Sequence, residues 1–179
     1  MSFTIAMNHS ACMERYKSKN TVLDCLKFDT IKLSDLRALY SENTPKYFLR
    51  SWLLQLNLFV NVSDENKLSE EQMIELAFLM YKEIYMLNLA ELTLLFERIK
   101  SGFYFPFYNR IDATQILIAC RSYRKERSVH LIEIEQRKIL ENDLKRVELE
   151  ARAETRRIKS SILFRRKNRI ITRKKNKTE

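Results

Sequence analysis

The chain has 179 residues, of which 45% are hydrophobic and 31% charged, and it carries a formal net charge of +10. This length accommodates one domain of about 100 to 150 residues together with an appendage. One glycine and two prolines leave too few tight turns for a hairpin-rich β fold. We therefore expect an all-α protein with a small domain of about four to five helices, a long projecting C-terminal helix and a basic tail.

The cysteines and the apolar segments indicate the cellular compartment of the protein. Cys12, Cys25 and Cys120 are odd in number and widely spaced, which argues against a disulfide framework and for a reducing environment. The first residues contain no apolar segment of a secretory signal, and no charge-free apolar run approaches the roughly 20 residues that a membrane span requires. We expect a cytoplasmic protein that does not span a membrane.

The residue types that carry catalysis form no recognisable pattern. A single glycine excludes the P-loop and the GxGxxG motif. His9 and Cys12 have a zinc-like spacing, but two further ligands would have to come from elsewhere. The carboxylate pairs at 70–71 and at 133 and 135 lie in amphipathic contexts typical of solvated helix faces. We predict no catalytic residue, no metal site and no cofactor, and a protein that is not an enzyme.

The first part of the chain predicts two helices after an irregular start. Residues 1–30 show no hydrophobic period and are interpreted as a partly ordered segment, which places the helical domain at residues 31–125. Ser34 is expected to cap a short helix with an acidic first turn. Thr44 is expected to cap the next helix, which has a proline at its first position and ends near residue 58.

Two capping boxes open the following helices. Ser69 and Gln72 stand at the ends of the sequence SEEQ, after a polar loop, and begin a helix that reaches about Met86. Asn88 and Glu91 have the same spacing and begin the next helix.

The segment KSGFYFPFYNRID (residues 100–112) holds the only glycine and five aromatic residues. Gly102 follows a helix with a basic last turn, so it is expected to adopt the left-handed conformation that ends helices. Pro106 prevents the helix from continuing. Two interpretations of the rings stay open: they anchor the segment in the core, or they stack on unpaired bases with Arg110 nearby.

A long helix follows this joint. Asp112 and Gln115 resemble a further cap, and no glycine or proline interrupts residues 113–157. Its first residues are spaced to pack on the domain, and residues 126–155 are predicted to project as a charged helix. Apolar residues at coiled-coil spacing follow at Leu140, Leu144, Val147 and Ala151. A dimer seam and a solvated single helix both remain interpretations.

Residues 156–179 carry the entire formal net charge. Eleven of the 33 basic residues and one of the 23 acidic residues of the chain lie here. Residues 1–155 therefore contain 22 basic and 22 acidic residues. Clustered charge of one sign binds polyanions, through phosphate contacts that do not read sequence. The predicted nucleic-acid-binding residues are Arg156, Arg157, Lys159, Arg165, Arg166, Lys167, Arg169, Arg173, Lys174, Lys175 and Lys177.

Other interpretations of this tail are a solubilising terminus, an anionic membrane surface and an acidic protein partner. The density of arginine and the absence of tryptophan in the tail favour DNA or RNA, because guanidinium groups match phosphate geometry.

A resemblance covers residues 96–127. The residues that carry it are Phe96, Lys100, Ser101, Gly102, Tyr104, Phe107, Tyr108, Arg110, Ile111, Asp112, Ile116, Tyr123 and Arg127. Their pattern resembles a signature of small helical proteins of bacterial mobile elements and bacteriophages. The resemblance implies an accessory protein encoded near replication functions and a fixed joint between two helices.

These observations predict a nucleic-acid-binding accessory protein that does not read sequence, while the helical domain or the long helix binds a protein partner. The alternative is a structural or protein-interaction module whose long helix pairs with itself, as a homodimer, or with another protein.

Overall fold

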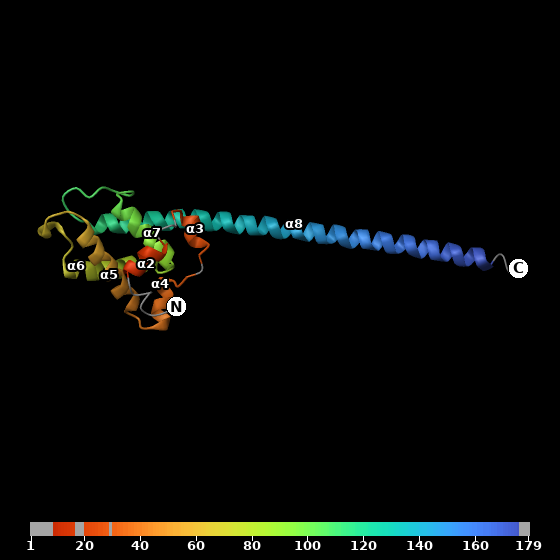
Figure 1. The fold of residues 1–179 in the computed structure, drawn as a ribbon, viewed down its shortest axis with the longest axis horizontal. Coiled ribbons are helices and arrows are strands. Elements are labelled where there is room, and N and C mark those ends of the chain that lie inside the picture. The colour runs from red at the N-terminus through yellow and green to blue at the C-terminus, as the bar shows by residue number, and fades with distance from the viewer. Residues whose placement is uncertain (1–8, 17–19, 29, 176–179) are drawn as a thin grey trace. The chain divides into compact units, whose positions relative to one another are not determined.

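The computed structural model describes residues 9–16, 20–28 and 30–175 (Figure 1). Over these residues it is all-α, without a strand, which confirms the expected fold class. The backbone divides into two compact units, residues 1–131 and residues 132–179. The helices are α2 (His9–Tyr16), α3 (Val22–Leu26), α4 (Leu33–Leu39), α5 (Thr44–Phe59), α6 (Glu70–Ile84), α7 (Leu89–Lys100) and α8 (Ala113–Lys175), with a 3-10 turn at Asp64–Asn66.

Two short helices lie in the range that was expected to be only partly ordered. Helix α3 begins after Thr21, whose hydroxyl accepts a hydrogen bond of 3.1 Å from the Asp24 amide. The side chains of Cys12, Tyr16 and Cys25 in α2 and α3 are buried in the core. Helices of eight and five residues are too short to show a clear period.

Two helix starts differ from the sequence interpretation. Helix α4 begins at Leu33, one residue before Ser34, because the Asp35 carboxylate accepts a hydrogen bond of 2.9 Å from the Lys32 amide. Helix α5 begins at Thr44, so Asn43 stands at the N-cap position and Thr44 lies inside the helix. The Thr44 hydroxyl instead lies 2.8 Å from that of Ser41.

Both predicted capping boxes are confirmed. The Ser69 hydroxyl accepts from the Gln72 amide at 3.2 Å, and the Gln72 side chain accepts from the Ser69 amide at 2.9 Å. At the start of α7, the Asn88 side chain accepts from the Glu91 amide at 2.8 Å and Glu91 accepts from the Asn88 amide at 3.0 Å. Helix α6 ends at Ile84, slightly before the predicted end at Met86.

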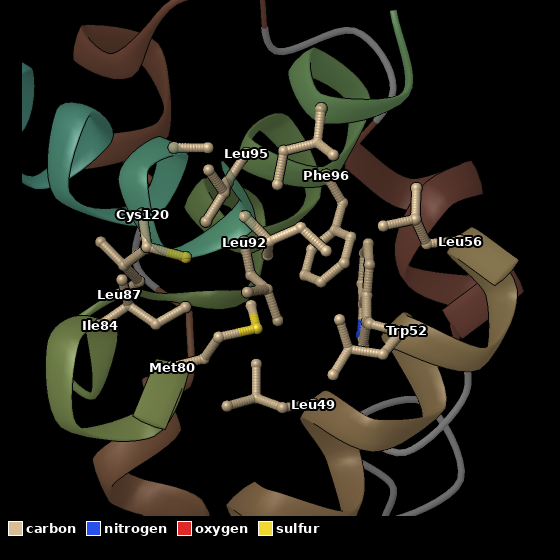
Figure 2. Close-up of a cluster of buried hydrophobic side chains, with 14 of the residues drawn as sticks. Leu49, Trp52, Leu56, Met80, Ile84, Leu87, Leu92, Leu95, Phe96 and Cys120 are labelled. Atoms are coloured by element: carbon tan, nitrogen blue, oxygen red, sulfur yellow. The ribbon is translucent and has the colours of Figure 1, made fainter. Parts of the chain in front are cut away.

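The core of the first unit lies between α5, α6, α7 and the start of α8 (Figure 2). The Trp52 ring of α5 packs against Phe96 of α7, with ring centroids 4.9 Å apart. Met80 of α6 and Cys120 of α8 enter the same cluster and are fully buried. Burial of this many large apolar side chains supplies the main stabilising term of the fold.

Gly102 ends α7 as predicted, with a φ of +74°. Its amide donates to the carbonyl oxygen of Ile99 at 3.1 Å, and the Phe103 amide donates to that of Arg98 at 2.9 Å. This pair of hydrogen bonds is the Schellman motif, which satisfies carbonyls at a helix end. At the other end of the joint, the buried Ile111 donates its amide hydrogen to Asn66 O at 2.9 Å.

The first part of α8 belongs to the first unit. The Asp112 carboxylate accepts a hydrogen bond of 2.7 Å from the Thr114 amide at the helix start. Arg98 of α7 forms two hydrogen bonds, of 2.6 and 3.2 Å, with the carboxylate of Glu126. The residues spaced to pack on the domain are fully buried, as predicted: Ile116, Ala119, Cys120 and Tyr123.

Candidate nucleic-acid interface

The described part of the second unit is α8 from residue 132 to Lys175, and its charge changes abruptly along the helix. Residues 132–155 contain seven acidic and five basic side chains. Residues 156–175 contain ten basic side chains and no acidic one. The cationic segment therefore begins at Arg156, within a continuous helix.

Cations before this point have carboxylate neighbours on the same helix. Arg146 lies 3.2 Å from Asp143, and Arg152 lies 3.9 Å from Glu148, one turn away in each case. From position 159 to position 174, no residue has a carboxylate within four positions along the chain. Helical pairing at i,i+3 or i,i+4 is thus impossible there, and like-charge neighbours repel each other.

The helix extends further than the sequence indicated. Its predicted uninterrupted range ended at Arg157, whereas α8 continues to Lys175. The side chains of Arg156, Arg157 and Lys159 are exposed. Lys177 lies outside the described residues. The other predicted contacts lie at helical backbone positions of α8: Arg165, Arg166, Lys167, Arg169, Arg173, Lys174 and Lys175.

Helical geometry sets the linear charge density of residues 156–175. Twenty residues rise about 30 Å along the axis at about 1.5 Å per residue, so their ten cations give about one charge per 3 Å. Duplex DNA presents about one negative charge per 1.7 Å. The two densities are of the same order, which allows many phosphate contacts along the segment. The helix macrodipole explains cations in the last turn only.

The basic positions fall on every side of a helix with 3.6 residues per turn. Positions 156 and 174, five turns apart, share one side, whereas positions 165 and 169 fall opposite to them. The apolar positions of the same segment are equally spread. An amphipathic helix that lies on a membrane needs a separate apolar face, and the sequence period provides none here.

The cysteines and the metal-ligating residue types give no second candidate site. Burial raises the pKa of the Cys12 thiol to about 11, and those of Cys25 and Cys120 to about 12, which keeps them protonated and unreactive at neutral pH. Within the described part of the chain, no group of three or more His, Cys, Asp or Glu side chains is placed to hold a metal ion.

A second hydrogen-bonded ion pair, missed by the sequence interpretation, also joins α7 to α8. The Arg127 guanidinium donates from Nε to Oε1 of Glu91 at 2.7 Å, in addition to the pair of Arg98 with Glu126. Glu91 was identified only as a capping residue. Its second role depends on a residue 36 positions away in the chain, for which a single sequence contains no spacing signal.

Among the described residues, no helix combines the length and apolarity needed to cross a membrane. Comparison with known protein families, with curated proteins and with solved structures gives no match.

Proposed function

We propose that the protein binds nucleic acid through the cationic segment 156–179, as an accessory protein of replication or of a mobile element or phage. The observation that carries this proposal is the separation of charge. A segment with eleven basic residues and one acidic residue follows a part of the chain in which the charges balance. Its phosphate contacts hold DNA or RNA without reading the base sequence.

The helical backbone of residues 156–175 supports this function. Like-charge repulsion opposes that helix in the free protein, and phosphates that neutralise the cations remove the repulsion. Binding and helix stability therefore favour each other. If about six cations reach phosphates of duplex DNA, affinity falls about 10³-fold or more between 50 and 200 mM salt.

The test is a titration of the full chain and of a 1–155 truncation, at these two salt concentrations. The ligands are single-stranded DNA, duplex DNA, RNA and anionic phosphatidylserine vesicles. The proposal predicts strong, salt-dependent binding of nucleic acid by the full chain and loss of that salt-dependent binding in the truncation. Equal binding by both chains, or binding of vesicles alone, contradicts it.

A second candidate function is pairing of the long helix with another copy or with a partner protein. Leu140, Leu144 and Val147 of α8 support it, because these large apolar side chains are 63%, 66% and 58% exposed at coiled-coil spacing. Sedimentation of the 1–155 truncation tests this candidate. A dimer that dissociates on Leu144→Ser substitution supports pairing, whereas a monomer at all concentrations rejects self-pairing.

A further inference from the structure

We infer that the loop between α7 and α8 binds an unpaired nucleobase, with the Tyr108 ring as the stacking surface and Arg110 beside it. The inference rests on the proposed function, since it assumes that the ligand is a nucleic acid and assigns its bases to a second site. Phosphate contacts belong to the cationic segment, and base contacts to this loop.

Exposure separates the five rings of the loop into two groups. Tyr104, Phe105 and Phe107 are partly buried and pack against the core. Tyr108 is 82% exposed and Phe103 is 64% exposed. The structure therefore supports core anchoring for three of the rings, while the other two face solvent and are accessible to a ligand.

The anchoring rings and the backbone hold the loop in one conformation. Phe105 and Phe107 pack edge to face, with centroids 5.2 Å apart. The Schellman motif at Gly102 fixes one end, and the hydrogen bond from the Ile111 amide to Asn66 fixes the other. A ring presented by an ordered loop loses little conformational entropy when a base stacks on it.

A surface hollow of about 530 Å³ lies beside the exposed ring, within the first unit. Phe105 and Tyr108 are its aromatic lining residues. Asn109 and Gln115 also line it, and both are residue types whose side-chain amides donate and accept hydrogen bonds. The edges of unpaired bases also carry both donors and acceptors. This combination of a stacking surface and amide groups matches a base better than it matches a purely apolar ligand.

Arg110 links this hollow to a second one. Its side chain is 73% exposed and lies 3.4 Å from the Asp112 carboxylate. Both residues also line the adjacent hollow of about 460 Å³, together with Asn66 and Gln72. A guanidinium at this place is able to stack on a base or to donate to its edge.

The charge of the loop indicates a base and not a phosphate as the bound group. Residues 100–112 contain Lys100 and Arg110 against Asp112, an excess of one positive charge. One charge is too few to hold a phosphate backbone. A base within a duplex has its faces stacked, so the site requires single-stranded DNA or RNA.

The direct test is a titration of the full chain with uridine 5′-monophosphate, followed by ¹H–¹⁵N NMR, with ribose 5-phosphate as the matched ligand without a base. We expect amide shifts at Tyr108, Asn109 and Arg110 with the nucleotide only, and their loss in Tyr108→Ala. No shift at these residues, or equal shifts with ribose 5-phosphate, overturns the inference. This readout does not depend on the cationic segment.

A second test separates this inference from the proposed function. The full chain is titrated with a 20-nucleotide oligothymidine and with an abasic strand of equal phosphate number. Tyr108→Ala is expected to lower affinity for oligothymidine about fivefold or more and to leave the abasic strand unaffected. Tyr108→Phe, which keeps the ring, and Tyr47→Ala, which removes a 60% exposed tyrosine from α5, should bind like the original chain.

The outcomes of the two tests are distinct. Equal affinity of the original chain for both strands, or an unchanged preference in Tyr108→Ala, contradicts the base site while leaving the proposed function standing. Failure to bind either strand contradicts the proposed function, and the nucleotide titration then decides the base site by itself.

Discussion

Arg127 of α8 donates a hydrogen bond of 2.7 Å to Glu91 of α7, and the Glu91 side chain is only 1% exposed. Burial raises the pKa of Glu91, while the Asn88 amide and the Arg127 guanidinium act in the opposite direction. The Arg127 side chain is itself 15% exposed. A largely buried pair of this kind fixes the position of one helix on the other, since the Glu91 carboxylate has almost no access to solvent as an alternative partner.

Substitution Glu91→Ala is expected to lower the free energy of unfolding by about 3 kcal/mol, because it leaves the largely buried Arg127 charge without its partner and removes the acceptor of the Asn88 amide. Urea denaturation measures the loss. The double substitution Glu91→Leu with Arg127→Met should lose less, because both charges are removed together. Glu148→Ala, in the exposed pair with Arg152, is the control and should change stability by less than about 1 kcal/mol. A double variant less stable than Glu91→Ala would contradict this account.

Substitution Gly102→Ala is expected to lower the free energy of unfolding by about 1 to 2 kcal/mol. The left-handed backbone conformation causes this loss, and a steric clash does not. An added Cβ would lie 3.6 Å from its nearest neighbour, the Phe105 carbonyl oxygen, which is an ordinary van der Waals distance. Gly102→Asn should lose less, since asparagine tolerates the left-handed region. Denaturation curves in which the alanine variant matches the original chain would refute the role assigned to this φ of +74°.

Because the three cysteines are buried, we expect the free energy of unfolding to decrease in alkaline solution. Their folded-state pKa values, about 11 for Cys12 and about 12 for Cys25 and Cys120, exceed the ordinary value of 9.0. Each buried thiol therefore contributes stability that is fully present below pH 9. This contribution decreases above pH 9, where only the unfolded chain ionises, and is lost as the pH rises through the folded value.

Thiol reactivity provides the matching measurement. At pH 8 the folded chain should react slowly with Ellman's reagent, and all three thiols should react rapidly in denaturing urea. Rapid reaction of one or more thiols in the folded chain would contradict their burial. Urea denaturation at pH 7 and at pH 10 gives the change in the free energy of unfolding between these two pH values. This decrease should be smaller in a cysteine-free variant than in the original chain.

Local signals in the sequence predicted much of the first unit. The boxes Ser69–Gln72 and Asn88–Glu91 and the stop at Gly102 depend on neighbours within a few residues, so a single sequence reveals them. Thr44 was misassigned because Ser41 binds its hydroxyl and Asn43 takes the cap position. That competition depends on the path of the chain before the helix.

Long-range relationships were not predictable in the same way. The pairs of α7 with α8 join residues 28 and 36 positions apart, and the division of the loop rings between core and solvent depends on how that loop packs. The candidate interface shows the opposite case. Its charge is visible directly in the sequence, whereas the continuation of helix α8 to Lys175 is visible only in the structure.

The most direct test of the central claim compares two triple substitutions that each remove three positive charges. Arg165, Arg166 and Lys167 are changed to glutamine in one variant, and Arg137, Lys138 and Lys145 in the other. Duplex DNA affinity is then measured against salt concentration. Loss of phosphate contacts in the first variant should reduce the slope of log K against log salt by about 2 to 3, while the second variant keeps the original slope. Equal reduction in both variants, or in neither, would contradict binding through the cationic segment.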